Sequence, residues 1–163
     1  MNKAKIMYEK AIISRDNVAR INFDKRYVDI EGRRINSDQP QMSLISTFIV
    51  FIINVSEGII GSLLASKIEK LWNSRNKNKI LKKFDATGKT QSLKPSFKLS
   101  NNQGTEITII VDSDLVQTQI INIFEIIKHL KKDRYIFMLG ENGTIKIFTE
   151  LEYAQSKHDL QNG

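Results

Sequence analysis

Few residues of this sequence have the types and spacing that catalysis requires. The chain has two histidines, His129 and His158, and no cysteine, which excludes thiol catalysis, disulfide frameworks and cysteine-based zinc sites. Neither histidine has a second histidine at metal-ligand spacing. Asp112 and Asp114 could pair for metal binding or acid–base chemistry, but capping of the helix predicted to follow them is the simpler account. We therefore expect no catalytic residue, no metal site and no cofactor.

Two further motifs fail on their spacing. Gly88-Lys89-Thr90 imitates the end of a phosphate-binding P-loop, but the position five residues before Gly88, where that loop needs another glycine, holds Lys83. No serine stands in a Gly-x-Ser-x-Gly nucleophile elbow. The sequence therefore predicts a protein that is not an enzyme.

The most distinctive segment is apolar and spans residues 43–65. From residue 39 to residue 66 the only ionisable side chain is Glu57, and the run from Leu44 to Ile53 is apolar nearly all round. A hydrocarbon core of about 30 Å needs roughly 20 helical residues. We therefore predict one long apolar helix within residues 41–74, as a candidate membrane span.

Two polar residues leave other structures open for this helix. Glu57 and Asn54 would lie near the middle of a bilayer, where such side chains are costly. A central helix over residues 43–72 in a soluble homo-oligomer, or a helical hairpin broken near residues 56–58, therefore remains an alternative. Small residues on one face would let two copies of the helix approach closely. These helix-packing residues are Gly58, Gly61 and Ala65.

The net charge of +7 is concentrated directly after the apolar segment. Residues 66–99 carry ten basic residues against two acidic ones, Glu69 and Asp85. Such a cluster beside a hydrophobic helix suits an anionic membrane surface, with Trp72 as an interfacial anchor. Nucleic acid is a second possible partner, and a solvated helix end is a third interpretation. The predicted basic patch consists of Lys67, Lys70, Arg75, Lys77, Lys79, Lys82 and Lys83.

The segments on either side complete an α+β fold class. Alternating apolar residues predict three short strands, a β-meander, within residues 1–40. After a basic linker at residues 75–93, two hairpins around an apolar-striped helix predict a ββαββ domain over residues 94–150. Residues 151–163 are expected to be a fraying tail. The pattern does not decide whether residues 1–40 and 94–150 share one sheet.

The order of features from Gly58 to Ile127 resembles the effector-associated constant component family of bacterial conflict systems. The features that carry the resemblance are the apolar helix with small residues, the basic stretch 75–83, the 96–111 hairpin and the helix led by Asp112. They cover less than half of the chain, and the second hairpin departs from the family pattern. The resemblance implies a non-catalytic adaptor or sensor that works beside a separate effector.

Three functional hypotheses follow. The first is a non-catalytic, membrane-associated accessory or adaptor protein of a bacterial defence or signalling system, with its C-terminal domain in the cytoplasm. That ββαββ domain would recruit an unidentified protein partner. The second is a cytoplasmic, soluble homo-oligomeric structural or interaction protein with helix 43–72 as its core. The third is a protein that binds nucleic acid through the basic segment 75–98.

Overall fold

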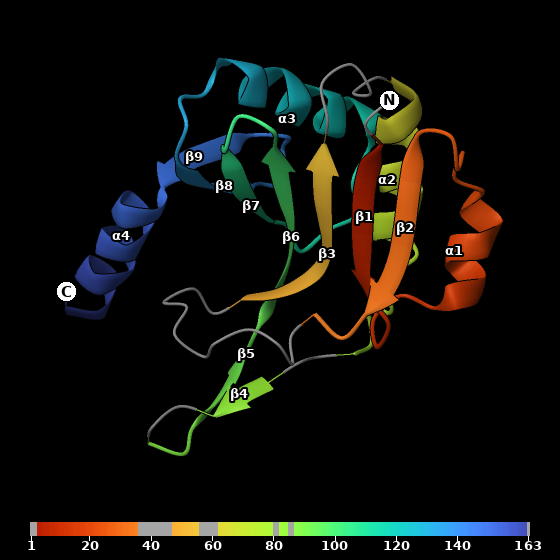
Figure 1. The fold of residues 1–163 in the computed structure, drawn as a ribbon. Coiled ribbons are helices and arrows are strands. Elements are labelled where there is room, and N and C mark those ends of the chain that lie inside the picture. Colours follow the sequence, from red (N-terminus) through yellow and green to blue (C-terminus); the bar gives the residue numbers. More distant parts are fainter. Residues whose placement is uncertain (1–2, 36–46, 56–61, 80–81, 85–86, 163) are drawn as a thin grey trace.

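Nine strands and four helices make up the part of the chain that the structure describes (Figure 1). The structure is a computed structural model, and it describes residues 3–35, 47–55, 62–79, 82–84 and 87–162. In chain order the elements are β1 (Ala4–Glu9), α1 (Arg15–Ile21), β2 (Val28–Arg33), β3 (Thr47–Val55), α2 (Ser62–Asn73), β4 (Lys82–Phe84), β5 (Thr90–Ser92), β6 (Lys94–Asn101), β7 (Glu106–Ile110), α3 (Gln117–His129), β8 (Arg134–Leu139), β9 (Ile145–Thr149) and α4 (Glu150–Asn162).

Seven of these strands form one mixed sheet in the order β2-β1-β3-β6-β7-β8-β9. The pairs β1/β2, β3/β6 and β7/β8 are parallel, and a helix connects the two strands of each pair. The pairs β1/β3, β6/β7 and β8/β9 are antiparallel. Because β3 pairs with β1 on one side and β6 on the other, the N-terminal and C-terminal segments belong to the same sheet.

Helices α1, α2 and α3 cover one face of the sheet and share its core. A row of five paired residues crosses this face, and all five are buried: Tyr8, Phe51, Phe97, Ile109 and Phe137. The apolar stripe of α3 packs on the same side, and α2 lies against α3. Burial of these side chains is the main favourable contribution to folding.

The crossovers over α2 and α3 have opposite hands. Both step in the same direction along the sheet, from β3 to β6 and from β7 to β8, but β3 and β7 run antiparallel to each other. Because α2 and α3 lie on the same face, one of the two crossovers is left-handed, which is rare. The other face carries only α4 among the described helices, through Tyr153, which packs with Ile110, Ile136 and Phe148.

The predicted long apolar helix of residues 41–74 is wrong. Its first half contains strand β3, and its last part is the separate helix α2. The run from Phe48 to Val55 is rich in β-branched and aromatic residues, which favour strands. The helix-covered face of β3 is fully buried at Phe51 and Ile53, and Ile52 on the other face is half-buried, so a run of apolar residues also fits a central strand. Within the described residues, none of the helices combines the length and the apolarity needed to cross a bilayer.

The predicted N-terminal β-meander is also wrong. Ser14 to Asn17, expected to be a turn between strands, begins helix α1, with the Ser14 hydroxyl accepting a hydrogen bond of 3.1 Å from the amide of Asn17. Strands β1 and β2 are therefore parallel and joined by a helix. At the other end, residues 151–163 were expected to be a tail, but α4 begins at Glu150, where Thr149 and Glu152 cap each other's backbone amides.

The five elements expected over residues 94–150 are present in the expected order, as β6, β7, α3, β8 and β9. Gly104 and Gly143 have positive φ angles of 86° and 73° in the two hairpin turns, a backbone conformation that glycine adopts without strain. These elements form half of the large sheet rather than a sheet of their own.

Because β3 is a strand, its neighbouring residues Ile52 and Ile53 face opposite sides of the sheet. Ile53 is fully buried under the helices, whereas Ile52 is half-buried on the other face. We expect Ile53→Thr to lower the free energy of unfolding by about 2–4 kcal/mol through lost packing and a buried hydroxyl. The matched variant Ile52→Thr should cost less than about 1 kcal/mol. Urea denaturation measures both, and equal losses would contradict the strand.

Candidate functional site

The last turn of α2 is fixed by the buried side chain of Arg75. Its guanidinium donates to the backbone carbonyl oxygens of Trp72 at 3.0 Å, Asp112 at 3.3 Å and Ser113 at 3.3 Å. Its carbon Cζ lies 4.5 Å from the centre of the Trp72 ring, in cation–π geometry. Only arginine has the planar set of donors for several acceptors at once. Arg75 therefore binds α2 to the loop that follows β7.

Two neighbours of Arg75 hold the same loop. The indole Nε1 of Trp72 donates to the carbonyl of Ser113 at 2.9 Å. The Asn73 amide donates to the carbonyl of Leu115 and accepts from its N–H, both at 2.9 Å. These bonds satisfy partly buried polar groups. They join residues that are 41 and 42 positions apart in the chain. The loop 112–115 therefore has a defined position beside α2.

Asp114 adds a charged contact to this cluster. Its carboxylate lies 2.7 Å from Lys77 Nζ and 3.4 Å from a guanidinium nitrogen of Arg75. The hydrogen bond from Lys77 holds the pKa of Asp114 below its ordinary 3.8, so the carboxylate is ionised at neutral pH. Burial lowers the pKa of Arg75 below its ordinary value, and Asp114 opposes that shift. Asp114 thus neutralises part of the positive charge at the end of α2.

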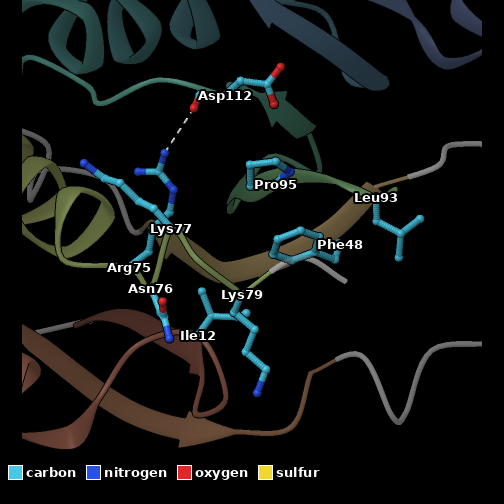
Figure 2. Close-up of a pocket in the computed structure, with 9 residues that line it drawn as sticks. All are labelled: Ile12, Phe48, Arg75, Asn76, Lys77, Lys79, Leu93, Pro95 and Asp112. Carbon is cyan, nitrogen blue, oxygen red and sulfur yellow. Dashed lines mark hydrogen bonds between the residues drawn. The ribbon is translucent and has the colours of Figure 1, made fainter. Parts of the chain in front are cut away.

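A pocket of about 200 Å³ opens next to Arg75, at the end of the sheet where β1 and β7 finish and β3 and β6 begin (Figure 2). Four apolar side chains and several polar ones, most of them cationic, surround it. The apolar residues are Ile12, Phe48, Leu93 and Pro95, and the polar ones are Arg75, Asn76, Lys77, Lys79 and Asp112. Its volume is below the roughly 300–1,000 Å³ of sites for drug-sized ligands, so it suits one ring-sized group.

A basic segment leaves the body of the protein at this pocket and returns to it. We call residues 75–94 the basic arm. It contains the small hairpin β4–β5, which projects beyond the end of the large sheet (Figure 1). The arm carries seven basic residues and one acidic residue, Asp85. Lys79 and Lys94, at the two ends of the hairpin, are exposed.

The residues of the predicted basic patch do not form one surface. Arg75 is buried, and Lys67 donates to the carbonyl of Ile21 at the end of α1, at 2.8 Å. Lys70 is exposed on α2. The others follow α2 along the basic arm: Lys77, Lys79, Lys82 and Lys83.

The remaining predicted residues have other positions. Trp72 is fully buried in the core. Its indole therefore does not lie at the surface, as an interfacial anchor would. Ala65 is also fully buried, in α2 against the core of its own chain. Gly58 and Gly61 lie outside the described residues.

Sequence reasoning missed the apolar part of the pocket and the role of Asp114. Phe48 and Pro95 pair across β3 and β6, although 47 positions separate them in the chain, and no local pattern indicates that pairing. Asp112 was expected to cap α3, but the helix begins after Val116, whose amide donates to the Gln119 side chain at 3.0 Å. Among the described residues, no group of three histidine or acidic side chains gathers as a metal site would require.

Replacing Arg75 tests the cluster. Arg75→Lys keeps the positive charge but removes the planar donors, so the Asp112 carbonyl loses its bond to the guanidinium and the Ser113 carbonyl keeps only its bond to the Trp72 indole. We expect the free energy of unfolding to fall by about 2–4 kcal/mol. Lys77→Ala removes the exposed lysine that pairs with Asp114, and it should lower the free energy of unfolding by less than about 1 kcal/mol. Urea denaturation gives both values, and a loss at Lys77 as large as that at Arg75 would be inconsistent with this description.

Comparison with known proteins adds no relative to these observations: no protein-family model, no curated protein and no solved structure matches the chain significantly.

Proposed function

We propose that the protein is a non-catalytic binding protein that holds single-stranded nucleic acid with its basic arm and the pocket at the root of that arm. The observation that carries the proposal is that cationic side chains and apolar, aromatic ones line one pocket, from which the arm extends. Single-strand binding proteins combine these two properties, since cations follow the phosphates and aromatic rings stack on the bases.

The charge distribution supports a polyanionic partner. Residues 66–99 hold a net charge of +8, more than the +7 of the whole chain, so the rest of the protein is slightly acidic. Exposed Lys79 and Lys94 stand where the arm leaves and rejoins the body. Each phosphate that a lysine neutralises releases counterions, which favours binding.

The pocket supports a single strand over a duplex. Phe48, which is 6% exposed, and the partly buried Pro95 line the pocket together with Lys79 (Figure 2). An unpaired base can turn away from its neighbours and enter a pocket of this size, whereas a base in a duplex is held by stacking and pairing. Base–aromatic contact does not depend on sequence, since every base has a π-face. The proposal is therefore binding with little sequence preference.

Two of the other hypotheses relied on a long helix that the described residues do not form. The membrane anchor and the oligomer core both required the long helix 43–72, whereas β3 and α2 are buried in the core of their own chain. The adaptor hypothesis assigned partner binding to the ββαββ elements, whose strands belong to the common sheet, and recruitment of a partner by them stays a prediction. The resemblance to the effector-associated family stays a prediction, and the described part of its helix with small residues corresponds to α2.

The salt dependence of binding tests the arm. We expect the protein to bind a fluorescein-labelled oligothymidylate of about 16 nucleotides, with affinity that falls steeply with salt. Each of Lys79→Gln and Lys94→Gln should reduce the slope of log K against log salt by about 0.7. Fluorescence anisotropy measures this slope. The matched controls are Lys25→Gln and Lys131→Gln, which precede β2 and β8 at the opposite end of the sheet. Equal effects at all four lysines would reject the arm as the binding site.

The pocket is tested separately from the charge. Phe48→Leu keeps apolar volume in the pocket but removes the aromatic ring. We expect it to weaken oligothymidylate binding about tenfold and to leave the salt slope unchanged. An abasic oligonucleotide of the same length should bind the wild type and the variant equally well. If Phe48→Leu has no effect on either ligand, the pocket does not hold a base.

A further inference from the structure

One edge of the large sheet, strand β9, presents backbone groups that no other described strand pairs with. The bond from Gly140 N–H to the Thr144 carbonyl, at 2.9 Å, sets the alternation of the β8–β9 ladder. By that alternation Lys146 and Phe148 hydrogen-bond to β8, whereas the N–H and C=O of Ile145 and Ile147 point outward. The amide of Thr149 also points outward, and Glu152 caps it at 2.8 Å. The free part of the edge therefore centres on Ile147.

Two large apolar side chains in β9 and at the start of α4 are exposed. Ile147 is 42% exposed and Leu151, two residues into α4, is 69% exposed. The opposite edge strand, β2, differs, because Asp29, Glu31 and Arg33 alternate along it and their side chains are exposed. Charged side chains protect an edge strand against pairing with another chain, and β9 has only Lys146. Among the described residues, the β2 edge is therefore protected by charged side chains and the β9 edge is open.

We propose that β9 is a self-association surface, on which β9 of a second copy of this chain pairs antiparallel about a twofold axis at Ile147. This register is self-complementary: Ile147 faces its own copy, and Ile145 faces Thr149 of the second copy. The outward N–H and C=O of Ile147 then bond reciprocally, and the two exposed Ile147 side chains cover each other. An interface of this kind is closed, because the same patch serves both copies.

The position of α4 fits a second copy at this edge. The helix extends away from the sheet beside β9 (Figure 1), and its one buried hydrophobic residue in the described part is Tyr153. Leu151 and Leu160 remain exposed along it, at 69% and 78%. A second copy paired to β9 would lie next to this helix and bury Leu151. The basic arms would remain outside the interface, because they leave the sheet at β6, away from β9.

Sedimentation equilibrium of the full chain without nucleic acid tests the proposal. From micromolar to millimolar concentration we expect the mass to rise from 18.7 kDa to twice that value. Ile147→Lys and Ile147→Asp should each weaken dimerisation about tenfold or more, since like charges would then face each other across the axis. Val116→Lys, at an apolar side chain of α3's cap that is 53% exposed, is the matched control and should leave the dimer intact.

Mixing the two charged variants fixes the register. An equimolar mixture of Ile147→Lys and Ile147→Asp should regain the dimer, because opposite charges would meet at the twofold axis. Loss of folding in a variant could not produce this rescue, and circular dichroism verifies that each variant is folded. A mass of 18.7 kDa at every concentration, or a mixture that stays monomeric, would overturn the proposal. Neither result depends on whether the basic arm binds nucleic acid.

Discussion

The contact on which the structure depends most is the burial of Trp72 between the sheet and the end of α2. The centre of its ring lies 5.7 Å from that of Phe51, in an edge-on arrangement, and 5.4 Å from that of Phe97. The two phenylalanine rings stack on each other with their centres 5.0 Å apart. Arg75 covers the indole from outside and bonds to the loop after β7. Sheet, helix and loop therefore meet at one aromatic cluster, which contributes packing and fixes geometry together.

This constraint also positions the candidate site. The basic arm begins at Arg75, so its point of departure is fixed by the buried guanidinium, while Asn76 bonds back through its N–H to the carbonyl of Ile12 at 2.7 Å. Phe48 and Pro95, at the start of β3 and β6, bring apolar surface to the same place. Because the base of the projecting cationic hairpin is rigid, a flexible nucleic-acid strand could be held at a defined point. We regard this arrangement as the basis of the proposed binding.

Some of the structure could be predicted from the sequence. Strict alternation in Ile107 and Ile109, with glycine turns beside them, specified the C-terminal hairpins, because period-two patterns and turn residues are local signals. Residues 44–53 misled the prediction, since an apolar run does not distinguish a central strand from a buried helix. Its β-branched residues were the overlooked signal. The lysines of the arm could be found by charge alone, but Trp72 and Arg75 could not be recognised as buried, because their partners Phe51, Phe97 and Ser113 are distant in sequence.

The most direct test of the central claim is a map of which backbone amides respond when a single-stranded oligonucleotide is titrated into isotope-labelled protein, followed by NMR. The account predicts shifts at Asn76, Lys77, Lys79 and Lys94, around the pocket and along the arm. Amides near Lys25 and Lys131, at the far end of the sheet, should not move. Shifts confined to that far end or to the open sheet face, or no shifts at all, would contradict the account.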